Sequence, residues 1–139
     1  MIELEIKGNA QKSLDASCQK FKKGCMNGLK KAGQIVKAEI KRLIKDPPKT
    51  GKKYQNLPNR SSAAGESPAY QTGVLSRSAN YVVPRWNEME VGVTAFYGKY
   101  LELGTEKMAP RPFVSVAVSS KYETVKIAIS MAVDKELGA

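Results

Sequence analysis

Apolar residues recur at steps of three and four between residues 10 and 45, and this spacing predicts one long amphipathic helix. Lysines fill the other faces. We expect the stripe to pack on a sheet, because its small residues would give a coiled-coil seam little to bury. The stripe consists of Leu14, Cys18, Phe21, Cys25, Leu29, Ala32, Val36, Ile40 and Leu43. Glycines at positions 24, 28 and 33 either allow another element to pack closely or mark a bend. Asp-Pro-Pro at 46–48 ends the helix.

Alternation with a period of two predicts strands in three places. Residues 2–7 alternate Ile, Leu and Ile with Glu, Glu and Lys, which is typical of a half-buried strand. Residues 81–83 and 89–93 resemble the two arms of a hairpin, and residues 84–87 would connect them. Pro84 is expected to mark the end of the first arm, because proline cannot donate to a central ladder.

The C-terminal third predicts two more helices. Residues 95–103 form a short one, a Gly-Thr turn follows at 104–105, and Pro110 and Pro112 suit the first turn of the next. That last helix runs to about Leu137; its β-branched residues leave a strand as the alternative, but length and spacing favour helix. Its apolar face would be Phe113, Val116, Ala117, Tyr122, Val125, Ile129 and Val133. The whole chain thus predicts one α+β domain, with a small antiparallel sheet against a long N-terminal helix and a C-terminal helix.

Residues 46–71 predict a long, mobile, basic loop within that domain. The segment is rich in Pro, Gly, Ser, Asn and Lys, and loops of this length are usually functional or disordered. It is a candidate arm that faces a partner or DNA, and a plain mobile loop is the alternative. The residues that would make the contact are Lys49, Lys52, Lys53, Tyr54 and Arg60.

The net charge of +10 is concentrated in the N-terminal part of the chain. Residues 1–53 carry fourteen Lys and Arg against five Asp and Glu, a net of +9, whereas residues 54–139 carry nine against eight. Such a field favours polyanions such as nucleic acid, or an acidic protein surface. A lysine face that only keeps the protein in solution is the alternative.

The residue types present argue against catalysis and metal binding. The chain has no histidine, the commonest general base and metal ligand. Its two cysteines, Cys18 and Cys25, are about two helical turns apart, which is too far for a disulfide, and we expect them to be buried thiols. We therefore expect no metal and no cofactor. No stretch is apolar enough for a membrane span or a signal peptide, which predicts a cytoplasmic product of its host cell.

The stretch from residue 95 to 118 concentrates the remaining candidate chemistry. Glu102 and Glu106 flank the Gly-Thr break, and paired carboxylates can perform acid–base catalysis. Nothing else in the sequence indicates a substrate pocket, so we expect local roles. Glu102 would pair with Arg111 or Arg77, or accept hydrogen bonds from backbone N–H groups at the turn. The predicted structural clamp consists of Tyr97, Tyr100, Leu101, Glu102, Gly104, Thr105, Arg111, Pro112 and Phe113.

Five segments, in this order and spacing, resemble the neck or tail-completion family of tailed bacteriophages, whose members are often labelled minor tail components. The segments are PKTGKKY at 48–54, SSAAGESPA at 61–69, TGVLSRS at 72–78, YGKYLELGT at 97–105 and MAPRPF at 108–113. The last one carries one proline, Pro110, beyond the pattern.

The resemblance implies a non-enzymatic virion protein, made in the bacterial cytoplasm, that assembles as a homo-oligomeric ring where the tail joins the capsid. Its neighbours would be the head–tail connector and the tail-terminator or tail-tube proteins, and phage DNA would pass through the ring with non-specific contact. It implies no membrane partner. The alternative is a nucleic-acid-binding module that uses the lysine-rich helix and the basic loop.

Overall fold

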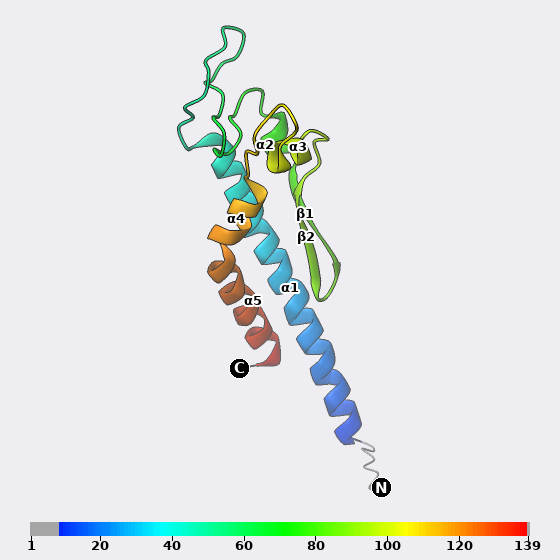
Figure 1. Cartoon of the computed structure of the whole chain (residues 1–139). Coiled ribbons are helices and arrows are strands. Elements are labelled where there is room, and N and C mark those ends of the chain that lie inside the picture. The colour runs from blue at the N-terminus through cyan, green and yellow to red at the C-terminus, as the bar shows by residue number, and fades with distance from the viewer. Residues whose placement is uncertain (1–8, 139) are drawn as a thin grey trace.

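The computed structural model describes residues 9–138, which form a long helix, a two-stranded hairpin and a broken C-terminal helix (Figure 1). The elements are α1 Asn9–Lys45, α2 Val74–Arg77, β1 Ala79–Arg85, β2 Glu88–Val93, α3 Gly98–Leu103, α4 Val114–Ser120 and α5 Tyr122–Leu137. The predicted α+β class is confirmed: a small antiparallel sheet and a C-terminal helix both pack on a long N-terminal helix. The strand predicted over residues 2–7 lies outside the described residues.

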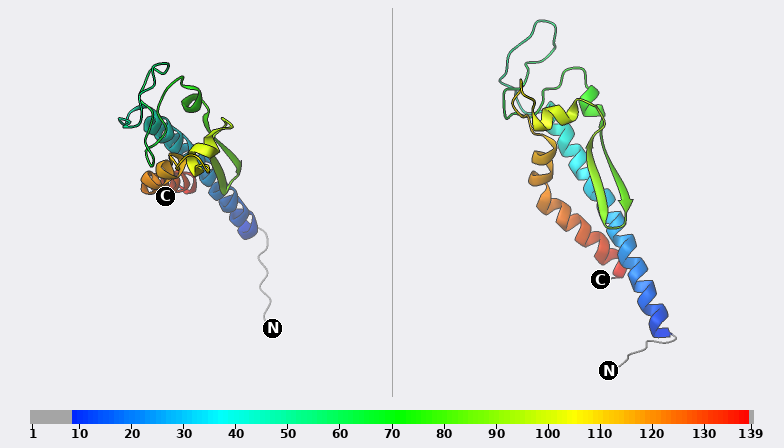
Figure 2. Two further views of the ribbon diagram at one scale, coloured as in Figure 1. Left: turned by 45° about the horizontal axis from the view of Figure 1, so that its top comes forward. Right: turned by 45° about the vertical axis from the view of Figure 1, so that its right-hand side comes forward.

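The centre of the molecule is α1, with α4 and α5 along one side of it and the hairpin along another (Figures 1 and 2). The predicted stripe therefore packs on a sheet and on a helix at once. The core lies toward the C-terminal end of α1, where Val36, Ile40 and Ile44 are buried against Phe113 and Ala117. Burial of such side chains contributes roughly 1.5–3 kcal/mol each.

The first third of α1 extends beyond every other element. All residues from 10 to 23 are exposed, including Leu14 at 53% and Phe21 at 42%. The prediction of buried thiols was wrong, since Cys18 is exposed and Cys25 is half-buried, although both are free. The reason is positional: the hairpin turn meets α1 at Phe21 and α5 meets it at Gly24, so among residues 9–138 no element covers the stripe before Phe21.

The glycines of α1 allow close packing, which was one of the two predicted possibilities. A Cβ at Gly28 would lie 2.8 Å from the Cα of Ile129, and one at Gly24 would lie 2.8 Å from the Cα of Val133. The backbones of α1 and α5 thus touch directly. Farther along, the ring of Tyr81 from β1 covers Gly33. Each glycine sits where a neighbouring element crosses α1, so a side chain there would push that element away.

The hairpin is longer than predicted and its turn is tighter. β1 and β2 pair antiparallel from Ala79–Val93 to Arg85–Glu88, and Trp86 and Asn87 form the connection. Pro84 lies inside β1 and does not end it, which corrects the prediction. The pairing shifts register between Val82 and Arg85, and this irregularity accommodates a residue that has no N–H to donate.

The predicted last helix starts later and is interrupted once. Pro110 and Pro112 precede α4 in extended chain and do not form its first turn. Lys121, at φ −103° and ψ 7°, separates α4 from α5. Of the expected apolar face, Val116 and Tyr122 are exposed, while Val125 packs against the core. The Lys121 Nζ lies 3.9 Å from Glu39 of α1, a buried carboxylate that also accepts two hydrogen bonds from Arg42.

None of the helices in the described range 9–138 combines the length and the apolar character that crossing a membrane requires. The segment from 46 to 71 contains no helix or strand, in agreement with the loop prediction.

Candidate functional site

The junction between α3 and α4 is held by the carboxylate of Glu102. Its oxygens accept hydrogen bonds from the backbone N–H groups of Phe113 at 2.8 Å, Val114 at 3.0 Å and Ser115 at 3.0 Å. These are the donors that the first turn of α4 leaves unsatisfied. Burial raises the pKa of Glu102, but the hydrogen bonds from Phe113, Ser115 and Val114 outweigh burial and hold this pKa below its ordinary value. Of the predicted roles for Glu102, capping of backbone N–H groups is the one the structure shows.

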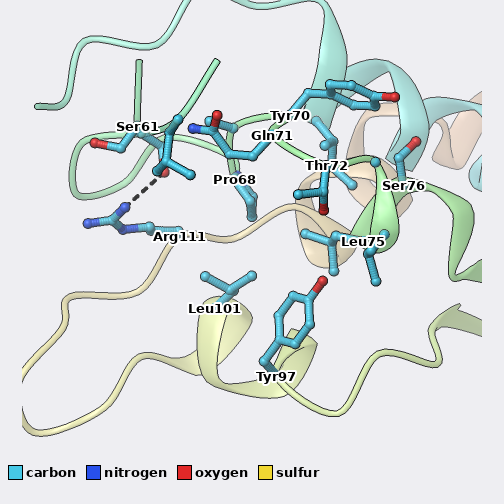
Figure 3. A pocket seen from close by; sticks show the side chains of 16 residues that line it. Ser61, Pro68, Tyr70, Gln71, Thr72, Leu75, Ser76, Tyr97, Leu101 and Arg111 are labelled. Carbon is cyan, nitrogen blue, oxygen red and sulfur yellow. Dashed lines mark hydrogen bonds between the residues drawn. The ribbon is translucent and has the colours of Figure 1, made fainter. Parts of the chain in front are cut away.

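Arg111 makes other contacts than the predicted pair with Glu102. Its backbone N–H donates to the carbonyl of Leu101 at 2.7 Å, and its Nη1 donates to the Oγ of Ser62 at 3.0 Å (Figure 3). Its Nε is buried without a hydrogen-bond partner. Within the described range, no ion pair joins Glu102 to Arg111 or Arg77. Arg111 therefore connects the end of α3 to the loop, while Glu102 connects it to α4.

The turn between these two contacts is tight. Gly104 ends α3 with φ 78°, and a Cβ there would lie 2.8 Å from the nitrogen of Pro110. Only glycine fits this left-handed conformation in so little space. Thr105 and Met108 exchange backbone hydrogen bonds of 2.8 and 3.3 Å, which closes the loop that Glu106 occupies. Glu106 is exposed on this loop, whereas Glu102 is engaged in capping α4. The two acids therefore do not form a shared site.

The apolar side chains of α3 and of the turn before it form two groups. Tyr97 and Leu101 are half-buried against the core. Tyr100 does not join them: it is 46% exposed, and Leu103 and Phe96, the latter in the turn before α3, are 75% and 82% exposed. We call Phe96, Tyr100 and Leu103 the α3 patch. Sequence reasoning missed this patch, although the spacing of four and three was visible and indicates a second helical stripe.

A cavity of about 270 Å³ lies beside this junction (Figure 3). Leu75, Tyr97 and Leu101 form part of its apolar wall, and Arg111 is the only charged residue among those that line it. Hydroxyl groups such as that of Ser62 also line the cavity, but none of the described lining residues is an Asp, Glu, His, Lys or Cys that could act as a base to activate them. Within residues 9–138, no group of three or more His, Cys, Asp or Glu side chains is placed to hold a metal ion.

The loop over residues 46–71 binds largely to itself. The carboxylate of Glu66 accepts from the N–H and Oγ of Thr50, at 3.0 and 2.5 Å, and from the N–H of Ala63 at 2.8 Å. The Thr50 hydroxyl, followed by these two N–H groups, lowers the pKa of Glu66 to about 2. Gly51 and Ser61 are also joined by a backbone hydrogen bond of 2.8 Å. These contacts hold the two arms of the loop together.

Three of the five predicted contact residues in the loop donate to carbonyls of the chain itself. Lys49 binds the carbonyl of Leu43 at 2.8 Å near the end of α1, and burial lowers its pKa. Lys53 binds the carbonyls of residues 57 and 58, and Arg60 binds that of Gly51. Lys52 lies over the ring of Tyr54 at 5.2 Å. Lys49 is thus a structural residue, whereas the other four remain exposed and a partner or DNA contact by them stays a prediction.

A second exposed apolar surface lies on the outer side of the C-terminal helix. Ile127 and Met131, one turn apart on α5, are 59% and 66% exposed. We call these two residues the α5 patch. Exposed apolar side chains grouped in this way, and not scattered singly, usually mark contacts with another molecule.

Comparison with family models, with curated proteins and with solved structures finds no match for this chain.

Proposed function

We propose that this chain is a non-enzymatic assembly protein that forms a homo-oligomeric ring at the head–tail junction of a tailed bacteriophage. The observation that carries self-assembly is the α3 patch, where three large apolar side chains face solvent on a small protein. Burying such side chains in an interface is favourable, at roughly 25 cal/mol per Å² of apolar surface. The junction beside the patch serves capping and packing.

Two distinct surfaces favour a ring over a two-fold dimer. The α3 patch lies near the loop end of the molecule, and the α5 patch lies on the C-terminal helix, away from that end (Figure 1). If one surface of a copy meets the other surface of the next copy, the contact is head-to-tail. Contacts of this kind generate rings when the rotation closes.

The phage assignment rests on the order of motifs from residue 48 to 113. Three of those motifs meet in the structure: SSAAGESPA supplies Ser62, MAPRPF supplies Arg111, and YGKYLELGT supplies Leu101 and Glu102. In a virion, the neighbours would be the connector, the tail-terminator or the tail-tube proteins. A ring that DNA traverses also suits a chain with a net charge of +10.

A nucleic-acid-binding module is the second candidate, because the exposed first third of α1 carries Lys12, Lys20, Lys22 and Lys23. It predicts oligonucleotide binding that weakens steeply with salt, since each neutralised phosphate releases counterions. The internal bonds of Lys49, Lys53 and Arg60 reduce what the loop would add.

The test is mass measurement over a concentration series, by sedimentation velocity and negative-stain imaging, alone and with purified tails or connectors. We expect closed assemblies, and we expect Leu103→Ser to weaken them roughly tenfold, as loss of a central apolar contact does. Val82→Ser is the matched control, because Val82 is also exposed but lies on the hairpin. A strict monomer that joins neither tails nor connectors would overturn the proposal, and salt-sensitive oligonucleotide binding by that monomer would favour the second candidate.

A further inference from the structure

Among residues 9–138, β2 pairs with β1 on one side only, so its other edge is free of any described strand. A free edge presents a row of backbone N–H and C=O groups and is a template for another strand. A groove of about 470 Å³ lies on this side of β2, bounded by α1 beneath and by α4 and α5 opposite, and no residue of β1 lines it. Its lining residues are Val36, Met89, Glu90, Val91, Val118, Tyr122 and Val125.

The two faces of β2 differ in polarity. Val91 and Val93 are half-buried and pack against the core. Glu90 is exposed on the other face, and a Cβ at Gly92 would meet nothing within 4 Å. A strand added to this edge therefore needs apolar side chains toward α1 and the groove and polar side chains toward solvent, with a period of two.

We propose that residues 2–7 of a second copy add to β2 as an antiparallel third strand. This segment alternates Ile2, Leu4 and Ile6 with Glu3, Glu5 and Lys7, so one face suits the groove and the other suits solvent. The inference rests on the self-assembly proposed above and gives it an interface.

Charge selects one register. With Lys7 opposite Glu90 in the antiparallel orientation, Glu5 lies opposite Gly92 and Glu3 opposite Thr94, so the single basic residue meets the acid and no acids face each other. On the inner face, Ile6 then lies opposite Val91 and Leu4 opposite Val93. A slip of two residues toward the turn would place Glu5 opposite Glu90. The parallel orientation with the same Lys7–Glu90 pair would place Glu5 opposite Glu88. Like charges directly opposite each other are destabilising.

In this register the segment cannot come from its own copy. Val91 lies opposite Tyr81 of β1, whose ring covers Gly33, twenty-four residues after the start of α1 at Asn9. At 1.5 Å per residue this is about 36 Å along the helix. Ile6, opposite Val91, is three residues before Asn9, and three extended residues span roughly 10 Å. The strand therefore comes from another molecule, and when each copy gives its strand to the next the contact is head-to-tail, as a ring requires.

A charge exchange in the full-length protein tests the register. Lys7→Glu and Glu90→Lys should each weaken self-association roughly tenfold, because each turns one cross-strand attraction into a repulsion. Combining them should restore association to near the wild-type level. Sedimentation equilibrium at low and high salt gives the dissociation constants, and circular dichroism verifies that each variant is folded.

A second pair tests the alternation. Leu4→Lys should abolish assembly, whereas Glu3→Lys, the matched control on the solvent face, should leave it within about twofold of wild type. If the wild type assembles and Lys7→Glu, Glu90→Lys and Leu4→Lys assemble equally well, the strand addition is overturned while the ring proposal stands. Failure of the double variant to regain association overturns the register. A wild type that does not assemble at all overturns both proposals.

Discussion

The two parts of α1 share one apolar spacing and have opposite surroundings. Residues 10–23 are exposed on every side, whereas Ala32, Val36 and Ile40 are buried. Both parts are helical without interruption, and both carry lysines on the other faces. The difference lies in the rest of the chain: α5 crosses at Gly24 and Gly28, and the hairpin lies along α1 from Phe21 to Gly33. Neither covers the turns before Phe21.

The contrast shows that a helical stripe predicts where a helix can be buried and does not say by what. In the later part of α1 the partner is in the same chain. In the first third of α1, Leu14 is exposed and no described element covers it. Single substitutions at matching positions in the two parts test this difference.

The largest expected effect is in the packed part. Ile40→Ala removes a side chain that is fully buried, and we expect a loss of about 2–5 kcal/mol in the free energy of unfolding. Leu14→Ala, its counterpart in the exposed part, should change that free energy by less than about 0.5 kcal/mol. Urea denaturation of dilute protein measures both. Equal losses would show that the first third is packed within a single copy.

A smaller effect is expected from the acids. Glu102→Gln weakens the hydrogen bonds to the first turn of α4 and should cost about 1 kcal/mol at pH 7. Because the folded pKa of Glu102 is lowered, its contribution is present above the ordinary Glu pKa of about 4.3 and is lost as the pH falls through the folded pKa. The gap between wild type and Glu102→Gln should therefore narrow at pH 3 in urea titrations.

The control for Glu102 lies in the exposed part of α1. Asp15→Asn changes an exposed carboxylate and should leave the stability at pH 7 unaltered within about 0.5 kcal/mol. A Glu102→Gln variant as stable as wild type at pH 7 would contradict its role as the cap of α4.

The smallest effect is expected at the boundary between the two parts. The ring of Phe21 meets Trp86 of the hairpin turn edge-on, with centroids 5.9 Å apart. Phe21→Ala should cost about 0.5 kcal/mol, the lower end for an aromatic pair because Phe21 is 42% exposed. It should also shift the emission of the single tryptophan to the red, because the indole becomes more hydrated. Leu14→Ala should leave the emission unchanged. An unshifted spectrum in Phe21→Ala would show that the hairpin turn does not rest on α1.

Most of the elements could be predicted because the sequence carries a local signal for them, either a regular spacing of apolar residues or a characteristic break. The spacing in α1, the hairpin alternation and the Gly-Thr break all correspond to described elements. The break at Lys121 left no such trace, since no proline or glycine marks it. The structure places Lys121 beside Glu39 of α1 at this break. Such a contact between residues far apart in the sequence could not be predicted from the local pattern.

The junction could be predicted only in outline. The sequence placed Glu102, Arg111 and Phe113 near one turn, and the structure brings them there. It could not say that Glu102 caps α4 while Arg111 reaches Ser62, forty-nine residues away, because that choice is decided by where the loop folds back. The α3 patch was overlooked because one apolar face of the short helix already explained its aromatic residues.

The close contact of α1 and α5 at Gly24 and Gly28 constrains how this protein can change. Because backbone meets backbone there, the distance between the two helices is set by the absence of side chains and not by their size. Mutational drift elsewhere in the core can exchange one apolar side chain for another of similar volume. At these two positions no such exchange exists, because any side chain would push α5 away from α1. The spacing of the helices, and with it the placement of the outward-facing residues on α5, therefore either stays unchanged or is lost through a single substitution.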